Sequence, residues 1–159
     1  MQSKPRVYVE TSFVSMLAAR PSRDVLAAAN QAVSAEWWDK RRHGFDIVVS
    51  EFVAAEAERG HPEAARRRLD LIADLPSLQA DSATFDLQAA LIAGGALPAS
   101  AEIDAFHVAL AAVNGIEYLL TWNCRHIANA TMRPRIESVC REHGFEPPII
   151  CTPAELMGE

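Results

Sequence analysis

Asp104 is the residue of this chain whose position most strongly suggests chemistry. It lies in segment 103–110, whose apolar side chains recur at helical spacing and so predict a buried helix. A carboxylate beside such a face costs free energy unless it is hydrogen-bonded, paired with a cation or bound to a metal ion. His107, three residues further on, flanks the same face. The expected apolar stripe consists of Ile103, Phe106, Leu110 and Val113.

Two further acids and one amide are expected at the same place. Glu10 ends an apolar segment that predicts a strand, and Glu56 lies on the inward face of the helix after the next strand. Asn123 closely follows a later strand. Because ligands of open parallel sheets bind beyond the carboxyl ends of the strands, these side chains are expected to share one acidic pocket. Oxygen ligands without cysteine suit Mg²⁺ or Mn²⁺, which support phosphodiester hydrolysis.

The clustering of carboxylates has an electrostatic consequence. Like charges repel, so at least one of Glu10, Glu56 and Asp104 is expected to have a raised pKa when no metal ion is bound.

The elements that position these residues alternate between short apolar strands and longer helices, a pattern typical of a parallel sheet covered by helices. Strands are predicted at 6–10, 45–49, 78–80, 118–121 and 148–151. Helices are predicted after a Thr11 or Ser12 cap, at 21–43, after a Ser50 cap, at 62–72, at 82–92, around Asp104 and in the second half of 125–143. The prediction is one α/β domain over residues 1–159, a three-layer α/β/α sandwich with a central parallel sheet.

Composition narrows the class of protein. The 159 residues suit one domain, and the 50% that are hydrophobic suffice for a sizeable core. Near the N-terminus a charge comes before any long apolar stretch, so the apolar region of a secretory signal is not expected. No stretch approaches the roughly 20 apolar residues of a membrane span. The three scattered cysteines indicate reduced thiols, a cytoplasmic location and no zinc site.

The charge distribution argues against one mode of nucleic-acid binding. A formal charge of −6 argues against binding through bulk positive potential, although it does not exclude nucleic acid. Basic residues nevertheless gather at 40–43, 66–68 and 125–135. Each of these runs, taken alone, is more typical of a solvated helix face than of a binding patch.

Each candidate also has an ordinary structural interpretation. Glu10 and Asp104 lie near helix N-termini, where the helix dipole favours acids. Glu56 can pair with an arginine, and Asn123 can shape a turn. His107 is more often a satisfied, partly buried histidine than a ligand. The joint placement of these residues at one end of one sheet still favours a site, because independent accidents seldom coincide.

Four segments resemble the motifs of the PIN-domain nucleases and, within that family, of the VapC-class toxins. They extend over nearly the whole chain, and four motifs in this order and spacing are fairly specific. Two positions depart from the family pattern, because Glu10 stands where Asp is usual and Asn123 stands where Asp is common. The four segments are 7–12 (VYVETS), 50–56 (SEFVAAE), 104–111 (DAFHVALA) and 120–127 (LTWNCRHI).

The resemblance implies a three-layer α/β/α fold, RNA cleavage that depends on Mg²⁺ or Mn²⁺, a homodimer and an inhibiting antitoxin protein. Glu10, Glu56 and Asp104 are expected to coordinate the ion. Asn123 is expected to be an auxiliary ligand or to position water, and this donor set suits one metal ion better than two. The residues expected to position the RNA backbone are Thr11, Ser12, Thr121, Arg125 and His126.

Two other functions stay open. One is a PIN-like module that binds RNA or protein and whose altered acids no longer support catalysis. The other is a phosphohydrolase of small molecules, which is less favoured because no Gly-rich phosphate loop accompanies the acids.

Overall fold

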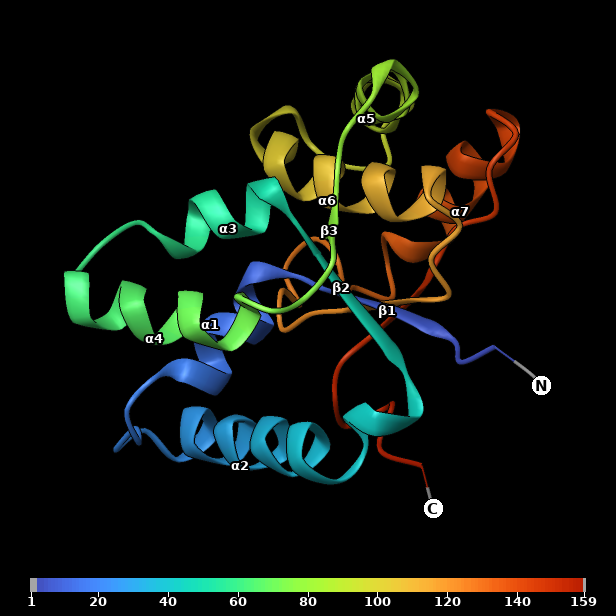
Figure 1. Ribbon diagram of the computed structural model, residues 1–159. Helices are drawn as coiled ribbons and strands as arrows, with labels where there is room; N and C mark the ends of the chain where they lie inside the picture. The colour runs from blue at the N-terminus through green and yellow to red at the C-terminus, as the bar shows by residue number, and fades with distance from the viewer. Residues whose placement is uncertain (1–2, 159) are drawn as a thin grey trace.

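The computed structural model describes residues 3–158, and a parallel five-stranded sheet forms the centre of this part of the chain (Figure 1). The strands lie in the order β3-β2-β1-β4-β5, and every neighbouring pair is parallel. The predicted parallel sheet is therefore confirmed, with strand ends shifted by only one or two residues. The strands are β1 (Arg6–Val9), β2 (Asp46–Ser50), β3 (Ser77–Leu78), β4 (Tyr118–Leu120) and β5 (Ile149–Cys151).

Helices cover both faces of the sheet. Figure 1 shows α5, α6 and α7 over one face and α1, α2 and α4 over the other, so the predicted three-layer arrangement is confirmed. Two short 3-10 turns, η1 (Arg42–Gly44) and η2 (Ala99–Ala101), precede β2 and α6. The helices in the described residues are α1 (Thr11–Ala18), α2 (Val25–Lys40), α3 (Glu51–Ala57), α4 (Pro62–Ile72), α5 (Ser82–Ala93), α6 (Glu102–Val113) and α7 (Arg133–Glu142).

Short polar residues determine where several helices begin. The Ser50 side chain accepts a hydrogen bond from the backbone N–H of Val53 and caps α3, as expected. Asp81 caps α5 and forms a capping box with Thr84. The predicted start of α2 near residue 21 is wrong, because Asp24 caps this helix and therefore begins it at residue 25.

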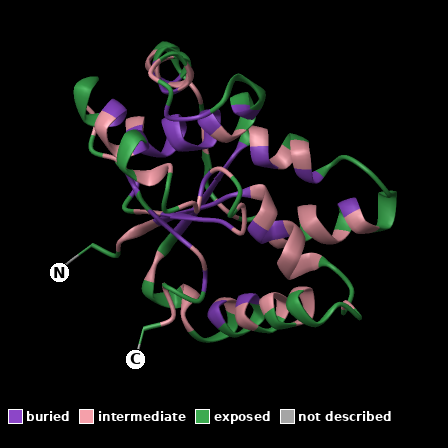
Figure 2. Cartoon of the chain, turned by 180° about the vertical axis from the view of Figure 1, so that it is seen from behind, coloured by how far each residue is buried: buried purple, intermediate pink, exposed green. Residues whose placement is uncertain are grey.

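The core lies between the sheet and its helices, and Figure 2 shows buried residues along the central strands. α6 is the most buried helix, because every residue from 105 to 112 is buried. A helix that is buried on all sides lies inside the protein rather than at its surface. The predicted apolar stripe was therefore too narrow, and it is wrong at Ile103, which is 43% exposed.

Asp104 and His107 differ in burial although both lie on α6. His107 is fully buried, whereas the Asp104 side chain, in the first turn, keeps 18% of its surface exposed. Within residues 3–158, no helix combines the length and the apolarity that a membrane span requires.

Candidate active site

The predicted site lies where the strand order reverses. From β1 the chain runs outward through β2 to β3, and it then returns to the other side of β1 with β4 and β5. β1 and β4 therefore flank the switch point, where open α/β sheets bind ligands beyond the carboxyl ends of their strands. Glu10 directly follows β1, and its backbone N–H donates to the carbonyl oxygen of Leu120, the last residue of β4, at 3.0 Å. Thr121 and Asn123 follow β4, so these three predicted residues lie at the switch point.

Glu10 is almost fully buried and serves as the N-cap of α1. Its Oε2 accepts hydrogen bonds from the backbone N–H of Ser12 at 2.8 Å and from the Thr121 hydroxyl at 3.0 Å, and also from the Ser12 hydroxyl. The expectation that Thr11 or Ser12 caps this helix is wrong. Glu10 keeps the extended backbone of an N-cap (φ −83°, ψ 158°), whereas Thr11 is already helical. One carboxylate therefore both starts a helix and belongs to the candidate site.

Asp104 is held by two residues of the loop that follows β4. Its Oδ1 accepts from the Asn123 amide Nδ2 at 2.9 Å, and its Oδ2 lies 2.8 Å from His126 Nδ1. Asn123 connects these groups to Glu10, because its backbone N–H donates to the Thr121 hydroxyl at 2.9 Å. The side-chain Oδ1 of Asn123 accepts from the backbone N–H of His126 at 3.1 Å. Asn123 thus positions Asp104 and shapes the loop at the same time.

Glu56 reaches the site from α3. Its Oε1 accepts from the Thr11 hydroxyl at 2.6 Å and lies 2.9 Å from His107 Nε2. Burial raises the pKa of Glu56, but hydrogen bonds from His107 and Thr11 stabilise the ionised form, and the net pKa is below its ordinary value. Glu56 is therefore not the carboxylate with a raised pKa that was expected among the three, since protein donors outweigh burial there.

Sequence reasoning missed the polar chain that extends behind Glu56. Tyr8, in the middle of β1, places its hydroxyl 2.8 Å from His107 Nδ1 and 2.8 Å from the Ser50 hydroxyl. All three side chains are buried, and burial raises the pKa of the Tyr8 phenol far above its ordinary value. His107 is therefore the satisfied, buried histidine of the ordinary interpretation. A tyrosine inside an otherwise apolar strand was the one available signal, because a buried phenol needs a partner.

The residues expected to position RNA fall into two groups. Thr11, Ser12 and Thr121 direct their hydroxyls to the carboxylates, and His126 directs Nδ1 to Asp104. Arg125 differs, because it is exposed and its backbone carbonyl is bound by Asn129.

The acidic side chains suit a hard divalent ion in chemical type. Glu10 and Glu56 each direct one oxygen to protein donors, which leaves Oε1 of Glu10 and Oε2 of Glu56 for a ligand. Asp104 has a protein partner at both oxygens. Within residues 3–158, no three His, Cys, Asp or Glu side chains form a group that is arranged to hold a metal ion.

An apolar groove runs beside the acids. It has a volume of about 490 Å³ and lies between β3, α5 and α6. Leu78, Phe85, Ile103 and Phe106 line it, and Ser50 is its link to the polar chain. Glu10, Glu56 and Asp104 are not among the residues that line it, so the groove and the acidic site are neighbours rather than one cavity.

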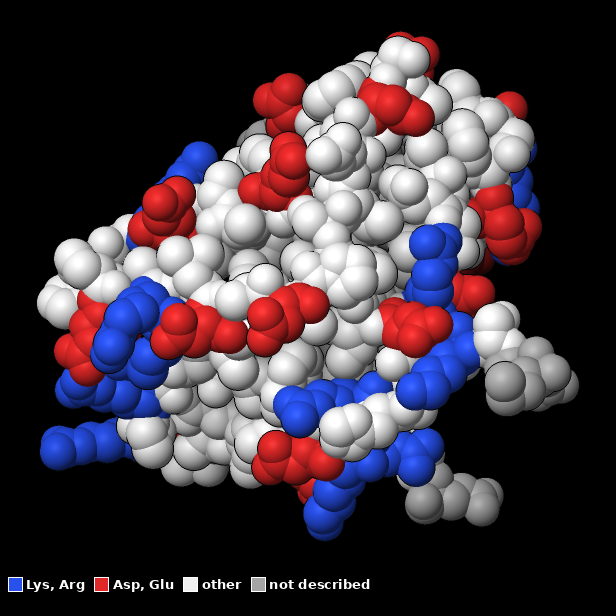
Figure 3. All heavy atoms as spheres, viewed as in Figure 1, with Lys and Arg blue, Asp and Glu red and all other residues white. Residues whose placement is uncertain are grey.

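Two arginines of the basic run 66–68 have structural partners. Arg67 pairs with Glu63 and donates its Nε–H to the carbonyl of Ala18, while Arg68 donates its Nε–H to the carbonyl of Ala57. These arginines thereby tie α4 to the ends of α1 and α3. Figure 3 shows Lys and Arg interspersed with Asp and Glu, in agreement with a solvated mixed surface.

Comparison of the chain with protein-family models, with curated proteins and with solved structures finds no match. The class of protein defined by fold and site together is thus an α/β protein with a hydrogen-bonded acidic network at the switch point of a parallel sheet.

Proposed function

We propose that this protein is a divalent-metal-dependent ribonuclease of the PIN-domain type, with Glu10, Glu56 and Asp104 as carboxylate ligands. The supporting observation is that these three acids, far apart in sequence, belong to one polar network at the switch point. Glu10 is joined to Asp104 through Thr121 and Asn123. It is joined to Glu56 through the adjacent residues Ser12 and Thr11.

The proposed roles follow from the hydrogen bonds of each side chain. When bound, a divalent ion supplies Lewis acidity toward the phosphate and the attacking water. Glu10 and Glu56 present their remaining oxygens, while Asn123 holds Asp104 in place. His126, oriented by Asp104 through Nδ1, offers Nε2 to a phosphate oxygen. The exposed Arg125 adds positive charge for the RNA backbone.

The biological setting proposed here rests on the resemblance of the four motifs. We propose a cytoplasmic toxin that forms a homodimer and is inhibited by an antitoxin protein. Growth inhibition on expression is then expected for the parent chain and not for Asp104→Asn.

A second candidate is a PIN-like module that binds RNA without cleaving it. The observation that favours it is the engagement of all three carboxylates with protein donors, together with the lack, within residues 3–158, of a three-residue group arranged for a metal ion. Under this alternative the network stabilises the loop after β4 and needs no ion.

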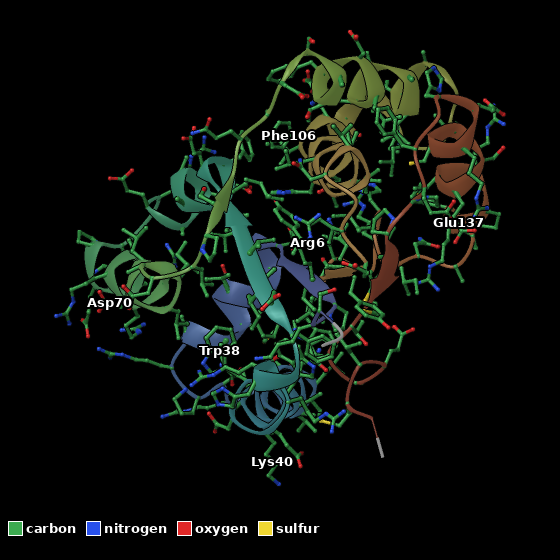
Figure 4. All side chains as sticks on the ribbon, turned by 45° about the vertical axis from the view of Figure 1, so that its right-hand side comes forward. Arg6, Trp38, Lys40, Asp70, Phe106 and Glu137 are labelled. Atoms are coloured by element: carbon green, nitrogen blue, oxygen red, sulfur yellow. The ribbon has the colours of Figure 1, made fainter. Side chains whose placement is uncertain are left out.

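The test is cleavage of a generic labelled RNA in Mn²⁺, with and without a chelator. Asp104→Asn keeps the side-chain shape but removes a charged ligand, so cleavage is expected to fall by about 100-fold or more. Asp70→Asn is the matched control, because Asp70 is an exposed acid of α4 at the periphery of the molecule (Figure 4). Equal cleavage in the chelator contradicts metal dependence. RNA binding without cleavage identifies the binding module instead.

A further inference from the structure

The polar side chains behind Glu56 form a continuous chain of hydrogen bonds, which core packing alone does not require. It runs from the backbone of α3 through Ser50 and Tyr8 to His107, and it ends on Glu56. The successive donor–acceptor distances are 3.0, 2.8, 2.8 and 2.9 Å. These side chains come from β2, β1, α6 and α3, so the chain links four elements, and its last member, His107, contacts Oε1 of Glu56.

We propose that Tyr8 and His107 are positioning residues that orient the carboxylate of Glu56 through a hydrogen-bond chain running in one direction. This inference concerns the hydrogen-bond chain, and its relevance to metal binding rests on the proposed ribonuclease function.

The direction of the chain follows from the number of protons available. The Val53 N–H has one possible role, which is to donate to the Ser50 oxygen. Ser50 then donates its hydroxyl proton to the Tyr8 oxygen, and Tyr8 donates its own to Nδ1 of His107. Nε2 of His107 carries the ring proton and donates it to Glu56. Every donor is used once.

The other neutral form of the His107 ring fits less well. A ring protonated only at Nδ1 turns the Nε2 lone pair toward the Glu56 carboxylate, which is repulsive. The hydrogen bonds of the chain are therefore all made when the proton of the fully buried ring lies on Nε2 and Nδ1 accepts from Tyr8.

The chain also selects which oxygen of Glu56 remains free. His107 and Thr11 both bind Oε1, so the carboxylate plane is fixed from two sides and Oε2 is left for a ligand. Protein groups that orient a metal ligand in this way tune its affinity, and their removal costs about 10–100-fold. Tyr8 acts through His107, because it sets the His107 tautomer that donates to Glu56.

The first test is the tautomer of His107, measured by long-range ¹H–¹⁵N correlation on the full chain labelled at histidine nitrogens. One protonated Nε2 and one unprotonated Nδ1 are expected, with the signals assigned by their loss in His107→Gln. In Tyr8→Phe, which removes the donor to Nδ1, the single tautomer is expected to give way to a mixture. Tyr118→Phe, which also removes a strand tyrosine hydroxyl, is the matched control and is expected to leave the His107 signals unchanged. An Nδ1–H or doubly protonated ring in the parent overturns the inference.

The second test separates positioning from mere structural support. His107→Gln keeps a donor near Nε2, whereas His107→Asn keeps polar atoms only near Nδ1. Calorimetric Mn²⁺ affinity is expected to stay near parental in His107→Gln and to fall by about tenfold in His107→Asn, although both lose stability. Equal affinities for the two variants overturn the positioning role. A parent that does not bind Mn²⁺ contradicts the proposed function, while the tautomer measurement still decides the inference.

Discussion

The Glu10 side and the Glu56 side of the acidic network differ in one of their donors. Glu10 is bound by the amide and hydroxyl of Ser12, two residues away, and by the hydroxyl of Thr121. Those two hydroxyls lie 3.1 Å apart, so each can rotate toward the other if Glu10 moves. Glu56 also accepts from a hydroxyl, that of Thr11, but its other donor is the ring of His107, which is fully buried and held by Tyr8. The comparison teaches that Glu10 is the adaptable acid and Glu56 the rigid one.

The largest expected effect is that of Glu56→Gln on catalysis. Glutamine keeps an acceptor oxygen for Thr11 and His107 but removes the charge, so RNA cleavage in Mn²⁺ is expected to fall by about 100-fold or more while the fold persists. Initial cleavage rates and a circular-dichroism melt measure the two properties. Glu58→Gln, an exposed acid beside α3, is the control. A Glu56→Gln variant that cleaves at the parental rate shows that the rigid acid is not a ligand.

The second effect concerns stability and compares the two sides directly. Glu56→Ala leaves the buried N–H of His107 without its acceptor, which is expected to cost about 2–3 kcal/mol of unfolding free energy. Glu10→Ala removes a helix cap but leaves hydroxyls that can bind each other, and it is expected to cost about 1 kcal/mol. Urea denaturation of both variants gives the two values. A larger loss of unfolding free energy in Glu10→Ala than in Glu56→Ala would mean that the Glu10 side is the more rigid.

The third effect is a pH dependence that arises from Glu56. Its pKa is lower in the folded protein than its ordinary value of 4.5, because hydrogen bonds from His107 and Thr11 outweigh burial, which raises it. The unfolded chain therefore binds this proton more readily, so the stabilisation is present above the ordinary pKa and is lost as the pH falls through the folded value. The difference in unfolding free energy between the parent and Glu56→Gln is expected to be constant down to about pH 5 and to shrink below that. A difference that grows in acid contradicts the assignment.

The smallest expected effect is at Asn123, on the Glu10 side. Asn123→Asp replaces the amide donor to Asp104 by a second carboxylate, whose repulsion a divalent ion relieves, so Mn²⁺ binding is expected to tighten. Asn123→Ala leaves Asp104 with one partner fewer and is expected to weaken binding. Calorimetry on the parent and both variants measures this. Three equal affinities would assign Asn123 to the loop alone.

The order of strands and helices was largely readable from the sequence. Periodicity and breaker residues located all five strands within one or two residues, and Ser50 was correctly identified as the cap of α3. The cap of α1 was not predicted, because a glutamate rarely caps a helix without extra donors, and Thr121 supplies one from 111 residues away.

The acids themselves were also visible in the sequence, since carboxylates near strand ends and on buried helix faces stand out by type and spacing. Only the tertiary structure decided what binds them. The contacts from Tyr8 to Ser50 and to His107 span 42 and 99 residues, and no local pattern encodes contacts at such separations. Hydrogen bonds from His107 and Thr11 lower the pKa of Glu56 although burial raises it, because hydrogen bonding depends on where atoms lie in the fold. Sequence spacing therefore determined which acids are candidates for the site, and packing determined how each carboxylate is held.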